Sequence, residues 1–94
     1  MTRIFETKEK SGRIIYLTDE RWKHILKHQE MSNQLEQIKD TLLHPDKITK
    51  VDYDSDVRFY YRYHKDRKEY LFVSVKYLNG ESFIITSFYT DKIK

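Results

Sequence analysis

Close to Pro45 in this 94-residue chain, the spacing of apolar residues changes from helical to alternating. Before that point, residues 19–30 and 32–44 carry apolar side chains every three or four positions, which predicts two amphipathic helices. After it the period shortens to two, and Tyr, Phe and β-branched residues become frequent, which predicts strands. The predicted strands are residues 47–53, 57–64, 70–78 and 82–90, with a hairpin from residues 3–7 and 12–18 before the first helix.

This order of elements predicts an α+β fold. Two N-terminal helices pack on one face of an antiparallel sheet of about four strands. Thr18 is the expected N-cap of the first helix and Ser32 that of the second. Asn79-Gly80 is the strongest turn signal in the chain, because both residues tolerate a positive φ.

The two C-terminal turns set the expected register. A regular two-residue Asn-Gly turn pairs Val73 with Thr86, and a Lys65–Glu69 charge pair sets the hairpin before it. The helices then cover one face, and the opposite face, called the open face below, carries polar and aromatic side chains. These are Arg58, Tyr60, Arg62, Ser74, Lys76, Ser87 and Tyr89.

Cations beside aromatic rings suit a nucleic-acid strand, because cations meet phosphates and rings stack with bases. An ordinary solvated sheet face is the alternative, and spacing by itself favours that alternative. The net charge of +3, from 18 basic and 15 acidic residues, is too small to indicate a polyanionic partner.

Composition excludes several kinds of protein. The chain has no Cys, which rules out disulfides and cysteine-based zinc sites. No apolar run approaches the length of a membrane span, and the N-terminus has no apolar core of signal-peptide length. We therefore expect one cytoplasmic domain over residues 1–94.

Two histidines of the first predicted helix are candidate acid–base groups. His24 and His28 stand four residues apart, on the same helix flank as Arg21. An imidazole accepts and donates protons near neutral pH, and a histidine pair at this spacing can also bind a metal. The chain specifies no third ligand, so we expect no metal site.

Several segments together resemble one protein family. They are IIYLTDERWKHILKHQE, IKDTLLHPDKI, FYYRYHKDRKEYLFVSVKY and FIITSFYT, in that order over residues 14–90. In order and spacing they are similar to the phage-associated branch of the barnase/EndoU/colicin/RelE-like nucleases. The resemblance implies a barnase/RelE-like α+β nuclease domain that needs no cofactor or metal. It implies an endoribonuclease in which the ribose 2′-hydroxyl attacks the adjacent phosphorus, acting as a toxin or phage-associated effector.

The resemblance also implies roles for individual residues. His24 is the favoured acid–base group, Arg62 and Lys76 stabilise the phosphate, and Thr86 or Ser87, with Tyr89, positions it. Further contacts with RNA are expected from Arg58, Tyr60, His28, Ser74 and Ser87. In a regular register Thr86 faces the helices. Either a bulge in the last strand brings it to the open face, or Ser87 takes its role.

The implied partners are RNA and an antitoxin-like inhibitor protein. Two other interpretations stay open on the sequence. One is a non-catalytic module that binds RNA or protein on the same fold. The other is an interaction protein that forms a homodimer through an exposed strand edge.

Overall fold

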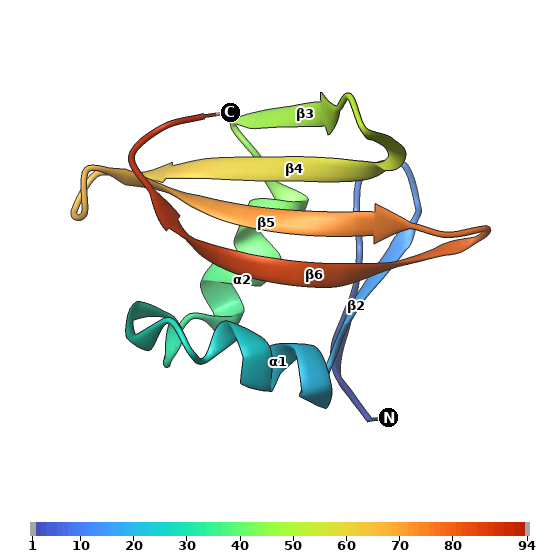
Figure 1. Cartoon of the computed structure of the whole chain (residues 1–94), viewed down its shortest axis with the longest axis horizontal. Helices are drawn as coiled ribbons and strands as arrows, with labels where there is room; N and C mark the ends of the chain where they lie inside the picture. The colour runs from blue at the N-terminus through green and yellow to red at the C-terminus, as the bar shows by residue number, and fades with distance from the viewer. Residues whose placement is uncertain (1, 94) are drawn as a thin grey trace.

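The computed structural model describes residues 2–93 and arranges them as one six-stranded sheet with two α-helices (Figure 1). The elements are β1 (Arg3–Lys8), β2 (Ile14–Thr18), α1 (Asp19–Ile25), the 3₁₀ turn η1 (Gln29–Met31), α2 (Leu35–Leu43), β3 (Lys47–Val51), β4 (Asp54–His64), β5 (Glu69–Tyr77) and β6 (Glu81–Thr90). The strand order is β1-β2-β6-β5-β4-β3.

The α+β class is confirmed, but the expected sheet of about four antiparallel strands is wrong. The N-terminal hairpin joins the sheet because β2 runs parallel to β6, with Ile14–Tyr16 beside Glu81–Phe83. All other neighbouring strands are antiparallel. The β2–β6 pairing links segments that are far apart in the sequence, and the local period of apolar residues contains no information about it.

The helices lie on one side of the sheet and along one of its borders. In Figure 1, α2 crosses behind the strands and α1 runs beneath β6. The core is made of fully or nearly fully buried side chains from both layers: Ile15, Leu17, Ile25, Met31, Ile38, Leu42, Tyr60, Leu71, Val73, Val75, Ile84 and Tyr89. The face opposite α2 is the open face of the sheet.

The first helix is shorter than its apolar period predicts. Thr18 caps it as expected, since its hydroxyl accepts a hydrogen bond from the Arg21 N–H at 3.2 Å. The helix ends at Ile25 instead of residue 30, and Leu26 is 37% exposed. The chain then turns through η1, which brings Met31 into the core with no exposed surface.

The predicted Ser32 cap of the second helix is wrong. The helix begins at Leu35 after Gln34, whose side chain makes no capping bond. The Gln34 Oε1 instead accepts a hydrogen bond from the Tyr89 hydroxyl at 2.5 Å. A contact with a distant strand therefore fixes the start of α2, and a local capping motif does not.

The register of the β4–β5 hairpin differs from the expected one by one residue. His64 lies opposite Glu69, so the turn has the four residues 65–68, and Lys68 adopts the left-handed region with φ of 55°. Two hydrogen bonds, from Arg67 N to His64 O and from Lys68 N to Lys65 O, hold this turn. Because successive side chains point to opposite faces, the shift exchanges the faces of all β4 side chains.

The exchange places Arg58, Tyr60 and Arg62 on the helix-covered side, so their expected position on the open face is wrong. Tyr60 pairs with Val73 and has no exposed surface. Its hydroxyl lies 2.6 Å from the Tyr77 hydroxyl. The ring fills the core while this bond satisfies its polar end, which accounts for the register.

The β5–β6 hairpin follows the expected register only as far as Val75 opposite Ile84. A bulge then leaves Ile85 without a partner and sets Ser74 opposite Thr86. Thr86 thus joins the open face, as the bulge alternative predicts. Ser87 and Tyr89 turn to the helix-covered side, so their expected place on the open face is wrong.

The Tyr60–Tyr77 contact gives a stability test. We expect Tyr60→Phe to lower the free energy of unfolding by about 1 kcal/mol, because it leaves a half-buried Tyr77 hydroxyl without its partner. Tyr63→Phe removes the same atom from a ring that is 43% exposed and is the matched control, with little expected change. Urea unfolding of both variants measures the difference. Equal stability of the two variants would contradict the assigned packing of Tyr60.

Candidate functional site

The residues expected to form one site divide between the two faces of the sheet. Three lie on the open face: Ser74, Lys76 and Thr86. Five lie on the helix-covered side: Arg58, Tyr60, Arg62, Ser87 and Tyr89. Of the two histidines of the helical region, His28 borders β6 through its contact with the Phe88 ring, and His24 lies on α1, which packs against β6. The open face and its α1 border therefore form the candidate site.

Lys76 is a fixed cation on the open face. Its Nζ lies 2.5 Å from Asp54 Oδ2, and both side chains are about 30% exposed. The hydrogen bond from Lys76 is the main cause that lowers the pKa of Asp54 below its ordinary value. The same bond raises the pKa of Lys76, so the ammonium stays charged at physiological pH.

A hydroxyl pair and a floor of aromatic rings accompany this cation. Ser74 and Thr86 lie directly opposite each other on β5 and β6. Phe72 packs against Phe88 with ring centroids 4.7 Å apart, and against Phe59 at 4.8 Å. Thr86 remains partly exposed, while Ser74 is 5% exposed. The open face thus offers a hydroxyl and π surfaces beside a positive charge.

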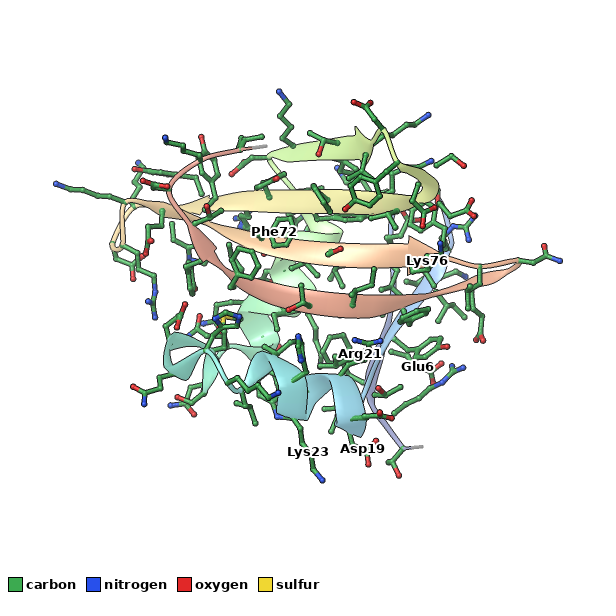
Figure 2. All side chains as sticks on the ribbon, in the orientation of Figure 1. Glu6, Asp19, Arg21, Lys23, Phe72 and Lys76 are labelled. Atoms are coloured by element: carbon green, nitrogen blue, oxygen red, sulfur yellow. The ribbon has the colours of Figure 1, made fainter. Side chains whose placement is uncertain are left out.

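The α1 region brings cations and imidazoles to the edge of this face. The His28 ring lies 5.4 Å from the ring of Phe88, which belongs to the open face. Arg21 lies three residues before His24 on the same helix, so both side chains are on one flank. Figure 2 shows Arg21 and Lys76 on opposite sides of β6, while Lys23 points away from the sheet.

A hollow of about 230 Å³ opens between α1, β2 and β6. It is lined by Tyr16, Thr18, Glu20, Arg21 and Phe83. Phe83 pairs with Lys76 across the ladder, so this hollow is adjacent to the fixed cation. The hollow is large enough for a small polar group and smaller than a typical pocket for a drug-sized ligand.

Sequence reasoning did not assign four residues of this region to the site: Tyr16, Asp54, Glu20 and Phe83. Glu20 follows a helix cap, where an acidic residue is common for structural reasons. Asp54 is the first residue of β4 and lies 22 residues from Lys76 in the sequence. The shared flank of Arg21, His24 and His28 was the one local signal that pointed to this border.

On the helix-covered side, the two arginines hold the chain in place. The Arg62 Nη1 donates to the backbone oxygen of His44, at the end of α2, at 2.6 Å. The Arg58 guanidinium lies 4.9 Å from the Tyr77 ring centroid and donates to the backbone oxygen of Val57. Their contacts are with the protein itself.

The hydroxyls on that side are also occupied. Ser87 is fully buried, and its Oγ donates to the backbone oxygen of Phe72 at 2.7 Å. Tyr89 is 8% exposed and donates to Gln34, and burial raises the pKa of its hydroxyl. These groups connect β6 to β5 and to the start of α2.

His64 forms a separate feature beside Tyr89. The centroids of the His64 and Tyr89 rings lie 5.4 Å apart, in an edge-to-face arrangement. The Arg67 guanidinium also contacts the Tyr89 ring, 4.1 Å from its centroid. Burial is the main cause that lowers the pKa of His64 below its ordinary value. Among residues 2–93, the buried His64 Nε2 has no hydrogen-bond partner. A neutral imidazole is therefore favoured here.

Neither a metal-binding cluster nor a membrane-spanning helix occurs in the described part of the chain. Residues 2–93 contain no group of three or more His, Asp or Glu side chains placed to hold a metal ion. They also contain no helix with the length and apolar character needed to cross a membrane.

Comparison with known proteins places the chain in a family. A family model described as phage-Barnase-EndoU-ColicinE5/D-RelE like nuclease2 matches residues 2–94. The search of curated proteins and the search of solved structures returned no match. The family match spans nearly the whole chain, so it covers both the open face and the α1 border.

His64 gives a pH test of this packing. Its pKa is lower in the folded than in the unfolded chain, so unfolding takes up a proton and stability falls as pH drops below about 6.5. We expect His64→Phe, which cannot titrate, to show a shallower loss of unfolding free energy between pH 7.5 and pH 5.5. These pH values are roughly one unit on either side of an ordinary histidine pKa. Urea unfolding across this range is the measurement, with exposed His44→Gln as control. An unchanged slope in the His64 variant would contradict the assignment.

Proposed function

Because this chain belongs to the phage-associated family of barnase/EndoU/colicin E5/D/RelE-like nucleases, we propose that it is an endoribonuclease that cleaves RNA without a metal ion. One observation carries the proposal on this chain: Lys76, held by Asp54, lies on an open sheet face that is bordered by α1, which carries His24, and by His28, whose ring contacts Phe88.

The proposed reaction needs three kinds of group. A base removes the proton from the ribose 2′-hydroxyl, and the resulting oxygen forms a bond to the adjacent phosphorus. The bond between phosphorus and the 5′-oxygen breaks, and an acid gives that oxygen a proton. A cation and hydrogen-bond donors stabilise the negative charge that builds on the phosphoryl oxygens. The products are a 2′,3′-cyclic phosphate and a free 5′-hydroxyl.

We assign these roles to side chains at the open face. His24 supplies acid–base chemistry from the α1 flank, because an imidazole can take and return a proton near neutral pH. Lys76 faces the phosphoryl oxygens, and Asp54 is a positioning residue that holds its ammonium. Thr86 lies opposite Ser74 and donates a hydrogen bond to the phosphate. Arg21 adds a second cation at the border.

Arg62 and Tyr89 have supporting roles in this proposal. Arg62 binds the end of α2 and Tyr89 binds Gln34 at its start, so together they hold α2 against the sheet. Their loss is expected to lower stability more than turnover by the folded protein. This changes the roles that the resemblance alone assigns to them.

A second candidate function is binding of RNA without cleavage at the same face. The His24 side chain makes no hydrogen bond or ring contact with any other residue in the range 2–93, so no second group prepares it for proton transfer. The low net charge of +3 also gives only weak general attraction to RNA. A binding module would show salt-sensitive affinity without turnover.

The test is cleavage of a single-stranded oligoribonucleotide in EDTA. We expect the wild-type protein to produce cyclic phosphate ends, and His24→Ala and Lys76→Ala each to lower kcat/KM by about 100-fold to 1000-fold. Lys23→Ala, whose side chain points away from the sheet, and exposed His44→Ala are the matched controls (Figure 2). Thermal unfolding verifies that all four variants fold.

The possible results separate the two candidates. RNA that stays intact with concentrated wild-type protein, yet binds with salt-sensitive affinity, supports the binding module. Cleavage that requires an added divalent ion rejects the metal-independent mechanism. Full activity of Lys76→Ala rejects the open face as the reaction site.

A further inference from the structure

A second hollow lies on the other side of Lys76, at the turn between β3 and β4. It is a shallow, open hollow of about 400 Å³, lined by Lys50, Val51, Asp52, Tyr53 and Phe59. Tyr53 is 83% exposed, more than any other large hydrophobic residue exposed in the described chain. Within residues 2–93 its side chain makes no hydrogen bond or ring contact. The packing of the protein gives no reason for an aromatic ring here.

This hollow lies beside the candidate site. Asp54, the residue after Tyr53, holds Lys76. Phe59 belongs to the aromatic floor of the open face, where its ring meets that of Phe72 edge to face. The turn that presents Tyr53 therefore also positions the proposed phosphate-binding cation.

The two hollows flank Lys76 along a line that crosses the strands. Phe83, in the hollow beside α1, pairs with Lys76, and Lys76 pairs with Val57 on β4. The next strand is β3, which leads into the turn of Tyr53. Neighbouring strands are about 4.8 Å apart, so this line from β6 to β3 is about 14 Å long.

We infer that this line binds single-stranded RNA, with one base stacked on Tyr53 in the hollow with Phe59, a phosphate at Lys76, and the next nucleoside in the hollow lined by Tyr16, Arg21 and Phe83. The Tyr16 and Phe83 ring centroids lie 6.3 Å apart there, and the Arg3 guanidinium covers one face of the Tyr16 ring at 3.7 Å. The inference rests on the proposed function, which supplies the polymer. Aromatic surfaces on both sides of a cation match the alternation of base and phosphate along one strand. Bases paired inside a duplex cannot reach such rings, so duplex RNA is a poor ligand.

Charged groups at the two ends fit the same ligand. Lys50 borders one hollow and Arg21 the other. Each of these cations would attract the phosphate that flanks the phosphate bound at Lys76. Each hollow also contains one carboxylate, from Asp52 or Glu20. A carboxylate accepts hydrogen bonds from base amino groups or ribose hydroxyls.

Binding of a short 2′-fluoro oligoribonucleotide tests the inference, because this probe lacks the attacking hydroxyl and cannot be cleaved. By fluorescence anisotropy we expect Tyr53→Ala to raise Kd by about 5-fold to 100-fold, the loss of one stacked base. Tyr53→Phe keeps the ring and is expected to bind as the wild type does. Ile48→Ala is the control for an exposed apolar side chain on the neighbouring strand, at 47% exposure, with no expected change.

Probes with one abasic nucleotide separate stacking from general weakening. When the missing base is the one that contacts Tyr53, we expect the wild-type protein to bind the probe more weakly than the intact probe. The wild type and Tyr53→Ala are then expected to bind this abasic probe with equal affinity. Unchanged affinity of Tyr53→Ala for the intact probe overturns the inference and leaves the exposed ring to a protein partner. A loss that is equal for intact and for every abasic probe also overturns it.

The outcomes are independent of turnover. Binding that depends on Tyr53, together with ordinary RNA that is never cleaved, rejects the proposed function and keeps the RNA-binding line. Cleavage of ordinary RNA, together with binding that ignores Tyr53, keeps the proposed function and rejects the line.

Discussion

The bulge at Ile85 decides what each face of the last strand presents. The extra residue sets Thr86 opposite Ser74 and turns Ser87 and Tyr89 toward the helices. Tyr89 then binds Gln34 at the start of α2, so a helix position depends on one unpaired residue of a strand. Without the bulge, the side chains of β6 after Ile84 would exchange faces. The core would then lose Ser87 and Tyr89, and the open face would lose Thr86.

The two faces consequently have different tasks. On the covered side, hydroxyls and guanidinium groups bind the protein's own backbone and side chains, which satisfies polar groups that burial would otherwise leave costly. On the open side, Lys76 forms an ion pair with Asp54 and lies opposite the partly exposed Phe83. A site that stabilises a phosphate needs a fixed cation and free space, and among the residues that the structure describes the open face offers both, which supports the proposal.

The family match and the geometry contribute separate parts of the functional conclusion. The match spans residues 2–94 and identifies the chain as a member of a nuclease family. It names no atoms. The positions of Lys76, Asp54 and α1 support the proposal that the open face carries the chemistry, and the hollows on either side of Lys76 support the inference that a strand with unpaired bases binds there.

Local signals were enough to predict the α+β class, the Thr18 cap, the strand segments and the Asn79-Gly80 hairpin as far as Val75 opposite Ile84. These features depend on residues close together in the chain. The parallel β2–β6 pairing, the faces of β4 and the Lys76–Asp54 ion pair were decided by tertiary structure. For the faces of β4 the physical reason is the two-residue period of a strand, because a shift of one residue reverses every side chain while leaving the sequence pattern unchanged. The strand pairing and the ion pair join residues that are far apart in the sequence.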